Sequence, residues 1–232
     1  MYYESAWRHS SVQDPRVWPI WETVRKYSGK GPLLEIGPGN LPKIPVKGSY
    51  FVELSTSAVH NLNKAGGHAY KATSRLPFRA SFFSLIACFE VMEHVKEDKR
   101  LFGEIARVLK PKGILLLSVP INMEHWMKWD EKAGHYRRYD PGKLVKYLET
   151  QGFTLVQFSV SGIQNTINKS RLLGNYINPF LIRFAALSTV RISLLLPIVT
   201  FFERMKGIEW HTSGLAEKAQ SQTNLTLVLR KK

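Results

Sequence analysis

Residues 33–55, LLEIGPGNLPKIPVKGSYFVELS, decide the fold class, because this stretch contains two short apolar runs that each end in a glutamate. Glu35 and Glu53 lie at corresponding ends of two predicted strands, and Gly37 and Gly39 follow the first strand. Glycine lets a ligand approach the backbone closely. In an open α/β sheet, ligands bind outside the carboxyl ends of the strands. The stretch therefore predicts a ligand site beyond these two strands.

The rest of the chain continues the alternation of strand-like and helix-like patterns. Apolar runs at 82–89, 113–120 and 224–232 predict further strands, the last of them closing the chain. Residues 55–66 and 96–113 have apolar positions at helical spacing. Asp140 and Pro141 have the pattern of a helix N-cap and first turn, and that helix ends at Gly152. The alternation predicts an α/β fold, a mostly parallel sheet with helices on both faces.

Composition limits the compartment and the partners. The chain has 232 residues, 44% of them hydrophobic, which suits one globular domain. The single cysteine, Cys88, excludes an internal disulfide, and we expect it to be a small buried residue. The N-terminal residues lack an unbroken apolar stretch, so we expect no secretory signal and a cytoplasmic protein. The net charge of +15 favours an anionic partner and leaves nucleic acid, membrane headgroups and acidic metabolites open.

Residues 163–222 interrupt the alternation with a long apolar and basic stretch. Its longest charge-free run, 192–202, is too short to span a bilayer, which takes about 20 residues. Pro197 would kink a helix there, and no clean polar face emerges around residues 176–206. We therefore expect a helical cap inserted before the last strand. A membrane-interface segment and simple packing on the sheet are the two alternatives.

The two glutamates indicate the chemistry of the ligand. A carboxylate at the end of the second strand is the usual partner of ribose hydroxyls, because it accepts two hydrogen bonds from a cis-diol. A dinucleotide fingerprint needs G-x-G-x-x-G, but Pro42 occupies the third glycine position. The acid two residues before Gly37 suits a cationic group, an amine or a sulfonium. The pattern therefore favours a nucleoside-containing, positively charged cofactor.

These residues resemble the first two motifs of the class I S-adenosylmethionine-dependent methyltransferases. Further stretches follow in the order of the small-molecule branch of that family: LPF at 76–78, FSLIACFEVMEHV at 83–95, LFGEIARVLKPKG at 101–113 and LLLSVP at 115–120. The resemblance covers roughly residues 30–160. It implies a Rossmann-like seven-stranded sheet with the last strand antiparallel. The methyltransferase domain would then comprise 1–162 and 223–232, with 1–30 as an N-terminal helical cap and 163–222 as the inserted cap.

The resemblance also implies a cofactor, S-adenosyl-L-methionine, and the residues that bind it. Glu35 and the backbone of Gly37 and Gly39 would hold the methionine part, and Glu53 the ribose. The remaining cofactor-binding residues would lie beside the adenine or close over the cofactor: Leu54 and Ser55, Thr73 and Ser74 (because Ala72 stands where the family often has an acid), and Phe89 and Glu90. No metal is expected.

The substrate side depends on GHYRRYD, residues 134–140. Guanidinium groups match carboxylates or phosphates, so one interpretation is that this segment binds an anionic substrate. In the other, one arginine is solvated and its neighbour pairs with an acid. The substrate-binding candidates are His135, Arg137, Arg138 and Tyr139. The catalytic group stays unassigned, with His135, Glu90 and His94 as candidates, because a base is needed only where the nucleophile carries a proton.

The predicted function is transfer of a methyl group from S-adenosylmethionine to a small, anionic or lipid-like acceptor. Nucleic acid is less favoured, because CFEVMEH at 88–94 replaces the proline-rich motif of base-methylating enzymes and Cys88 lacks a proline context. A third alternative is a peripheral membrane or partner-binding protein on a degenerate methyltransferase fold. The partners are thus a small-molecule acceptor and an anionic membrane surface at the periphery, with the oligomeric state left open.

Overall fold

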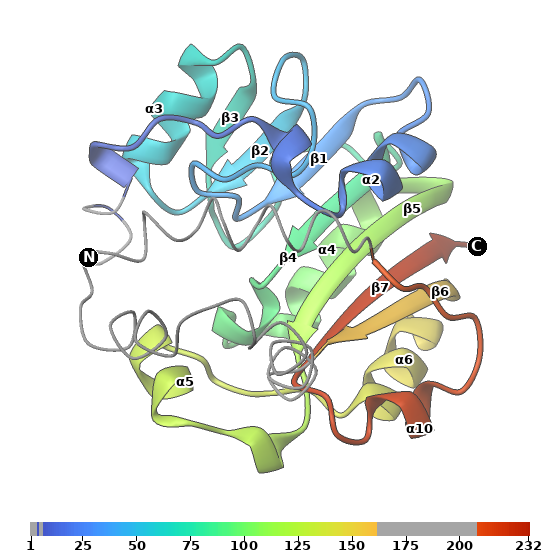
Figure 1. Cartoon of the computed structure of the whole chain (residues 1–232). Helices are drawn as coiled ribbons and strands as arrows, with labels where there is room; N and C mark the ends of the chain where they lie inside the picture. Colours follow the sequence, from blue (N-terminus) through green and yellow to red (C-terminus); the bar gives the residue numbers. More distant parts are fainter. Residues whose placement is uncertain (1–3, 5–6, 162–207) are drawn as a thin grey trace, which may run out of the picture.

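A seven-stranded sheet of order β3-β2-β1-β4-β5-β7-β6 forms the centre of the molecule (Figure 1). The computed structural model describes residue 4 and the ranges 7–161 and 208–232. The strands β3, β2, β1, β4 and β5 are parallel, whereas β7 runs antiparallel to both β5 and β6. This arrangement confirms the predicted Rossmann-like sheet with an antiparallel last strand.

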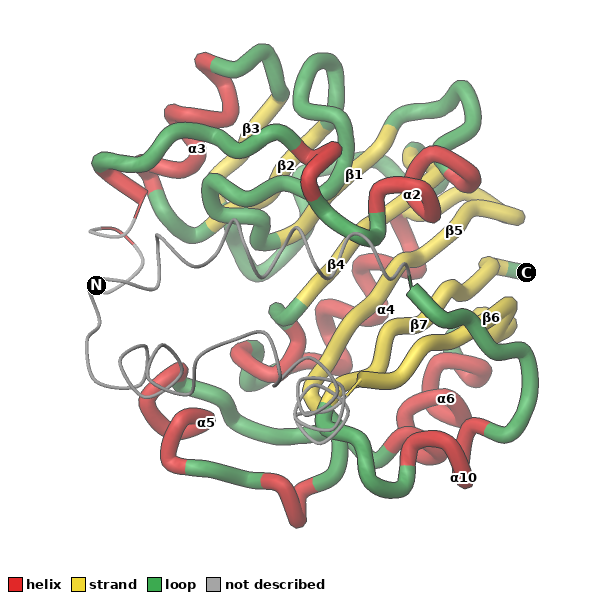
Figure 2. The backbone as a smooth tube through the Cα atoms, in the orientation of Figure 1, coloured by secondary structure: helices red, strands yellow, loops and turns green. Residues whose placement is uncertain are grey.

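The strands and helices follow the alternation in the sequence. The strands are β1 (Leu33–Ile36), β2 (Tyr50–Glu53), β3 (His68–Lys71), β4 (Phe83–Phe89), β5 (Leu109–Pro120), β6 (Phe153–Ser161) and β7 (Asn224–Lys231). The described α-helices are α2 (Trp21–Tyr27), α3 (Thr56–Lys64), α4 (Asp98–Val108), α5 (Lys128–Ala133), α6 (Pro141–Thr150) and α10 (Leu215–Ala219). Short 3₁₀ helices lie at η1 (Pro15–Val17), η2 (Met92–His94) and η3 (Met123–His125). Figure 2 shows the strands enclosed by helices and loops.

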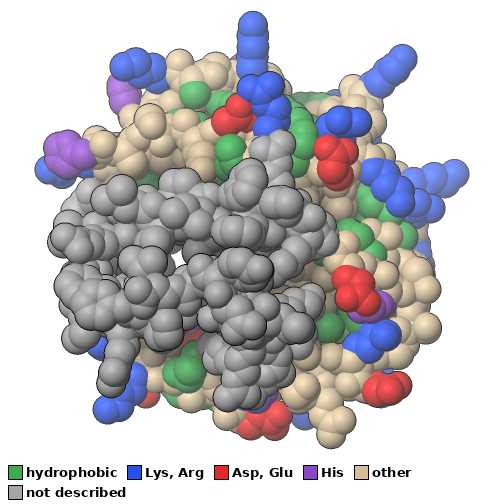
Figure 3. Space-filling model, viewed as in Figure 1, with side chains coloured by type: hydrophobic (Ala, Val, Ile, Leu, Met, Phe, Trp, Pro, Cys, Tyr) green, Lys and Arg blue, Asp and Glu red, His purple; other side chains and the backbone are tan. Residues whose placement is uncertain are grey.

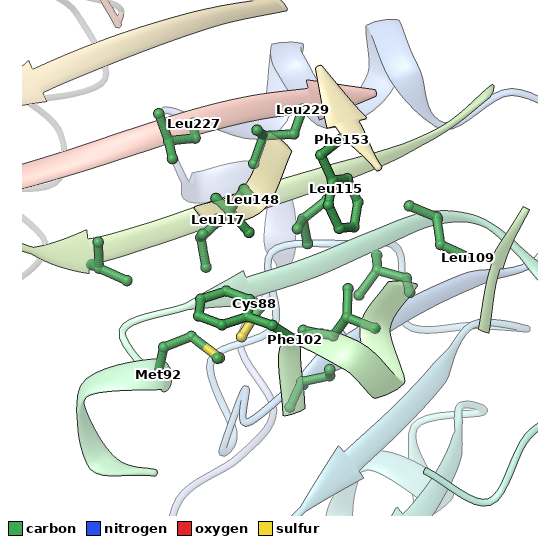
Figure 4. Packing of buried hydrophobic residues seen from close by; sticks show 14 of the residues in the cluster. Cys88, Met92, Phe102, Leu109, Leu115, Leu117, Leu148, Phe153, Leu227 and Leu229 are labelled. Atoms are coloured by element: carbon green, nitrogen blue, oxygen red, sulfur yellow. The ribbon is translucent and has the colours of Figure 1, made fainter. Parts of the chain in front are cut away.

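The sheet is buried on both faces because side chains alternate along its strands. Leu115 and Leu117 of β5 belong to the cluster that contains Phe102 of α4 and Leu148 of α6 (Figure 4). Leu116, between them, belongs to a second cluster that contains side chains of α2 and α3. Residues i and i+2 of a strand share a face. A parallel sheet with helices on both sides therefore needs the nearly continuous apolar runs seen in the sequence.

The connection between β1 and β2 contains no helix, and a buried carboxylate holds it in place. Glu35 is 1% exposed, and its Oε2 accepts hydrogen bonds from the backbone N–H groups of Lys43 (2.8 Å) and Ile44 (3.2 Å). These bonds satisfy donors that a helix would otherwise pair within its own turns. Ile44 is thereby fixed in the core, with no exposed surface.

The predicted insertion at 163–222 lies only partly within the described residues. Of the expected cap at 163–222, residues 163–207 lie outside the described residues. Residues 208–222 pack on the sheet: His211 exchanges two backbone hydrogen bonds with Phe158, and Ala219 of α10 is buried in the core. At the N-terminus, Val24 of α2 is fully buried against the sheet. Among the helices that the structure describes, none is long and apolar enough to cross a membrane.

Candidate functional site

A cavity of about 480 Å³ lies beyond the carboxyl ends of β1, β2, β3 and β4. Its wall includes Ile36 at the end of β1 and Gly37 after it, Glu53 at the end of β2, Thr73 after β3 and Glu90 after β4. From β1 the chain moves outward to β2 and β3, then returns to place β4 on the other side of β1. Such a reversal of strand order creates a crevice where ligands bind. The position of the cavity therefore follows from the strand order.

Two glycines bring the backbone to the cavity wall. Gly37 has a φ angle of +68° and Gly39 one of +57°, values that favour glycine. A Cβ atom on Gly37 would lie 2.6 Å from a methyl group of Val91, and one on Gly39 would overlap the indole ring of Trp7. Both positions thus need glycine for conformation and for space. Val91 and Trp7 also line the cavity.

Glu53 connects the glycine turn to the end of β2. Its side chain is only 6% exposed, and its Oε2 accepts a 2.8 Å hydrogen bond from Gly39 N. Its Oε1 accepts hydrogen bonds from the backbone N–H groups of Leu54 (2.6 Å) and Ser55 (3.0 Å). A carboxylate has about four acceptor positions, and three are used here, so about one remains for a ligand hydroxyl. Glu53 is therefore oriented before any ligand binds.

Burial changes the protonation of Glu35. Loss of hydration raises the pKa of this carboxyl to about 7, against the opposing effect of Lys43 and of the two backbone hydrogen bonds. Glu35 does not line the cavity. Its position below the 37–44 connection makes it a residue that positions the glycine turn.

Glu90 occupies a strained backbone position at the end of β4. Its φ angle is +53°, a left-handed conformation that residues other than glycine rarely adopt. Its Oε1 accepts hydrogen bonds from Ser118 Oγ (2.6 Å) and Asn224 Nδ2 (2.9 Å), which join β4 to β5 and β7. Strain of this kind persists where surrounding contacts enforce it, commonly at functional sites.

Most of the residues predicted to bind the cofactor lie in the cavity wall. Leu54 is 63% exposed there, an unusual position for a large apolar side chain. Ser55 instead caps α3 through its Oγ, and Phe89 is only 7% exposed within the core. The predicted residues that line the cavity are Gly37, Gly39, Glu53, Leu54, Thr73, Ser74, Glu90 and His94. Those that do not are Glu35, Ser55, Phe89, His135, Arg137, Arg138 and Tyr139.

The structure also adds Lys96 and Arg100 to the cavity wall, and the wall includes Trp7 from the segment 1–30 that was expected to form a cap. Trp7 covers Gly39 from the N-terminal segment, and Lys96 and Arg100 reach the wall from the segment that leads into α4 and from α4 itself. The expectation of an N-terminal cap at 1–30 included Trp7, but no spacing pattern indicated that this side chain would lie against Gly39. Lys96 and Arg100 could have been found, since they follow the fourth strand on its ligand side.

The two adjacent arginines pair with acids instead of facing the cavity. Arg138, 8% exposed, donates to both carboxylate oxygens of the fully buried Asp130, from Nε and Nη2 at 3.0 Å each. Arg137 forms a 2.7 Å ion pair with Asp98. The hydroxyl of Tyr139 donates to the same Asp98 at 2.9 Å. Both guanidinium groups are thus engaged within the chain: Arg138 pairs with an acid, as the second interpretation had it, and Arg137, 29% exposed, also pairs with one.

Glu93, His94 and His135 gather beside the cavity. His94 Nε2 lies 3.9 Å and His135 Nε2 4.0 Å from Glu93 Oε1. Burial, together with the charge of Glu90, raises the pKa of Glu93 well above its usual range. Burial and the neighbouring His135 lower the pKa of His94, which favours the neutral imidazole.

The fold and the cavity together define the class of protein. An α/β sheet with a cavity at its switch point, a glycine turn after β1 and an acid ending β2 is an architecture for nucleoside-containing cofactors. The family model described as a methyltransferase domain matches residues 28–158, more than half of the chain. The chain belongs to the class I S-adenosylmethionine-dependent methyltransferase family, whose members are enzymes with S-adenosylmethionine as cofactor.

Curated relatives match over a limited stretch. An uncharacterised protein of Methanocaldococcus jannaschii is 36% identical over 81 residues, 35% of this chain and 35% of its own length. A Mycolicibacterium smegmatis protein named "Probable S-adenosylmethionine-dependent methyltransferase" is 29% identical over 82 residues, 34% of this chain and 32% of its own length. The match thus spans about a third of either relative.

Solved structures share the fold over nearly the whole chain. An S-adenosylmethionine-dependent methyltransferase of Thermotoga maritima has a TM-score of 0.57 at 17% identity, covering 91% of this chain and 87% of its own. Phosphoethanolamine N-methyltransferase 2 of Haemonchus contortus, solved with S-adenosyl-L-methionine, has a TM-score of 0.56 at 15% identity, covering 100% of this chain and 56% of its own. At these identities the likeness shows the fold.

Proposed function

We propose that this chain transfers a methyl group from S-adenosylmethionine to a small, anionic or lipid-like acceptor. The observation that carries the proposal is the cavity of about 480 Å³ between the glycine turn and the preoriented carboxylate of Glu53. Family membership supports the cofactor. The lipid-like alternative for the acceptor is supported by the apolar sequence of 176–206, outside the described residues.

The residues present fit this cofactor. Glu53 would accept hydrogen bonds from the ribose, the bare backbone at Gly37 and Gly39 would face the methionine part, and exposed Leu54 would pack on the adenine. Thr73 and Ser74 would lie at the adenine edge. The cofactor supplies a methyl group on a sulfonium, which has an excellent leaving group. The chain mainly has to orient the acceptor and exclude water, and Val91, Leu76 and Leu101 provide apolar wall for this.

Two cationic side chains of the cavity wall support an anionic acceptor. Lys96 and Arg100 line the cavity and are exposed, so their charges remain available. They take over the role first assigned to Arg137 and Arg138, which are bound to Asp98 and Asp130. On the face shown in Figure 3, Lys and Arg side chains are spread out with acidic side chains among them. The cavity wall also contains acidic side chains, Glu97 and Glu104 among them, so the indication comes from the positions of Lys96 and Arg100 and not from net charge.

Binding of S-adenosylhomocysteine by the full chain tests the cofactor part of the proposal. We expect calorimetry to show one site per chain. At a hundredfold excess over Kd the ligand should stabilise the fold by about 2.7 kcal/mol, seen as a higher Tm. If millimolar S-adenosylhomocysteine gave neither binding heat nor a higher Tm, the cofactor part would be wrong. The chain would then be a non-catalytic protein on a degenerate methyltransferase fold.

Methyl-labelled S-adenosylmethionine tests the acceptor. The full chain would be incubated separately with small-molecule, lipid and nucleic-acid extracts of the source cells. We expect label in the small-molecule or lipid fraction. Labelling of nucleic acid alone would overturn the acceptor assignment, because it matches the rival function.

Once an acceptor is identified, its charge can be tested at Lys96 and Arg100. The double variant Lys96→Gln, Arg100→Gln should raise KM for an anionic acceptor about tenfold or more, since each charge-assisted hydrogen bond contributes about 1.5–3 kcal/mol. Cofactor affinity should change little. Lys99→Gln is the matched control, because this exposed lysine of the same helix does not line the cavity. If Lys99→Gln raised KM as much, the increase would come from the loss of positive charge on the protein surface and not from contacts of Lys96 and Arg100 with the acceptor.

A further inference from the structure

Glu93, His94 and His135 form a cluster at the edge of the cavity, outside the part assigned to the cofactor. Glu93 and His94 belong to η2, which follows β4, and His135 follows α5, which lies after β5. The two segments are joined by a 2.7 Å hydrogen bond from Tyr136 N to Glu93 O. This backbone hydrogen bond holds the two segments together, so the three side chains are close to one another because of the backbone arrangement.

The carboxylate of Glu93 has no hydrogen-bond partner among the described residues. Its side chain is completely buried, and neither Oε1 nor Oε2 is satisfied. Leaving a buried polar group unpaired costs about 1–3 kcal/mol, and more for a charged one, so such a group calls for an explanation. A cation bound at this carboxylate would provide one.

The geometry suits a metal ion. One ligand atom from each of Glu93, His94 and His135 lies within 4.8 Å of the other two, and the imidazole rings meet edge to face, 4.6 Å between centroids. Ligand atoms around Zn²⁺ at about 2.0–2.2 Å from the ion lie roughly 3.3–3.6 Å apart. The two Nε2 to Oε1 separations, 3.9 and 4.0 Å, need to shrink by a few tenths of an ångström. The third separation, between the two imidazoles, is within 4.8 Å and needs a rotation of one ring to close.

A second layer of hydrogen bonds orients His135. Its Nδ1 lies 2.8 Å from Oδ1 of buried Asp130, so Nδ1–H donates to the carboxylate and the lone pair of Nε2 is directed away from Asp130. Asp130 is itself held by Arg138. A carboxylate that accepts from the far nitrogen of a histidine is the usual support of a metal-binding imidazole. Arg138 thus acquires a positioning role through Asp130.

We propose that Glu93, His94 and His135 bind one divalent transition-metal ion of the Zn²⁺ type. Two imidazoles and one carboxylate suit such ions, whereas Mg²⁺ and Ca²⁺ prefer oxygen ligands. The proposal replaces the expectation of no metal, which was made from sequence patterns alone. Sequence signals existed: Glu93 and His94 follow the fourth strand, and His135 follows the fifth, so all three lie at the ligand end of adjacent strands.

An ion here would keep an open coordination position toward the cavity. His94 lines the cavity, whereas Glu93 and His135 lie behind it. Three protein ligands with an open position are typical of catalytic zinc, and structural zinc takes four. The open position would take an oxygen of the acceptor, a hydroxyl or a carboxylate. This second step rests on the proposed methyl transfer, whereas metal binding itself does not.

Metal binding is tested by titrating the chelator-treated full chain with Zn²⁺, and in parallel with Mg²⁺, by calorimetry without cofactor. The variants are Glu93→Gln, His94→Ala and His135→Ala. His125→Ala is the matched control, because η3 repeats the sequence Met-Glu-His of η2 with the same 3.9 Å between His125 Nε2 and Glu124 Oε1. Glu124, however, is 68% exposed. Circular dichroism would establish that each variant is folded.

We expect the unaltered chain and His125→Ala to bind one Zn²⁺ each with equal Kd, and the three cluster variants to bind at least about tenfold more weakly. Mg²⁺ should bind far more weakly than Zn²⁺. The proposal is overturned if the unaltered chain binds no Zn²⁺, if Mg²⁺ binds as tightly, or if the cluster variants retain the original Kd.

A second measurement avoids variants altogether. Co²⁺ bound to the unaltered chain should show visible absorption bands of a low-coordinate site, and S-adenosylhomocysteine should shift them because His94 belongs to the cavity wall. Bands of six-coordinate aqueous Co²⁺ would contradict the site. S-adenosylhomocysteine binding without Zn²⁺ binding would reject the metal site and leave the methyltransferase proposal intact. Zn²⁺ binding without S-adenosylhomocysteine binding would reject the methyltransferase proposal and leave the metal site intact.

Discussion

The carboxylate of Glu53 has two tasks, because it holds the glycine turn through Gly39 N and would also accept the ribose hydroxyls. Glu53→Ala should weaken S-adenosylhomocysteine binding by about 1.5–3 kcal/mol, the range for hydrogen bonds to a charged group. It should also lower the free energy of unfolding, since Gly39 N, Leu54 N and Ser55 N lose their acceptor. Calorimetry and urea unfolding measure the two effects separately. Unchanged affinity in a folded variant would remove Glu53 from the ribose role.

Individual side chains were the part of the site least accessible from the sequence. Arg137 and Arg138 are adjacent, yet they pair with Asp98 and Asp130, which come from different segments. No spacing rule connects those positions, because the contacts depend on how the segment after β5 folds back onto η2. Gly37 and Gly39 were recognisable because their role depends on the local backbone.

The glycine turn after β1 and the indole of Trp7 form one packed unit. Gly39 and Gly29 have nearly equal φ angles, +57° and +56°, but a Cβ on Gly29 would meet nothing within 4 Å. Both Gly→Ala variants should carry a similar backbone penalty of about 1–2 kcal/mol. Gly39→Ala should be clearly worse in urea unfolding, because it also displaces Trp7.

A double-mutant cycle separates the two contributions in this turn. In a Trp7→Ala background, the excess cost of Gly39→Ala over Gly29→Ala should disappear, since the clash partner is gone. An excess that persists would place the clash elsewhere in the turn. We also expect Gly39→Ala, and not Gly29→Ala, to weaken S-adenosylhomocysteine binding.

Strong periodicity and clear caps made most elements predictable. Asp140 caps α6 as expected, accepting from Lys143 N at 2.8 Å, and α3 lies within its predicted range. The edge strand β3 was missed because its side chains are mostly exposed, so burial did not select an apolar pattern. The helix predicted over 96–113 spans only Asp98–Val108 in the structure, because β5 already begins at Leu109.

The order of the strands, and not any one strand, creates the cavity, and this explains why the ligand end could be predicted before the structure. Parallel strands place their carboxyl ends on one edge, and the reversal between β1 and β4 opens that edge. The wall contributed by Trp7 could not be predicted in this way, because the path of the N-terminal segment depends on tertiary contacts. One of them is the bond from Asn40 Nδ2 to Ser10 O.

The stability of the whole molecule should depend on pH through Glu35. Its pKa is about 7 in the folded chain and near the ordinary 4.5 when unfolded. Between these values the folded chain retains a proton that the unfolded chain releases, so the free energy of unfolding falls as pH rises from about 4.5 to 7. At roughly 1.4 kcal/mol per pKa unit, the loss attributable to Glu35 is about 3 kcal/mol.

Glu35→Gln tests this dependence, because the glutamine oxygen can still accept from Lys43 N and Ile44 N while the charge is gone. Urea unfolding from pH 5 to pH 8 should show a shallower decline for Glu35→Gln than for the unaltered chain, with the variant relatively more stable at pH 8. Glu22→Gln, at an exposed position of α2, removes the same charge and should leave the decline unchanged. Parallel profiles for the unaltered chain and Glu35→Gln would mean that Glu35 is ionised in the folded molecule at the same pH as in the unfolded one. The 37–44 connection would then be held by a fully charged carboxylate.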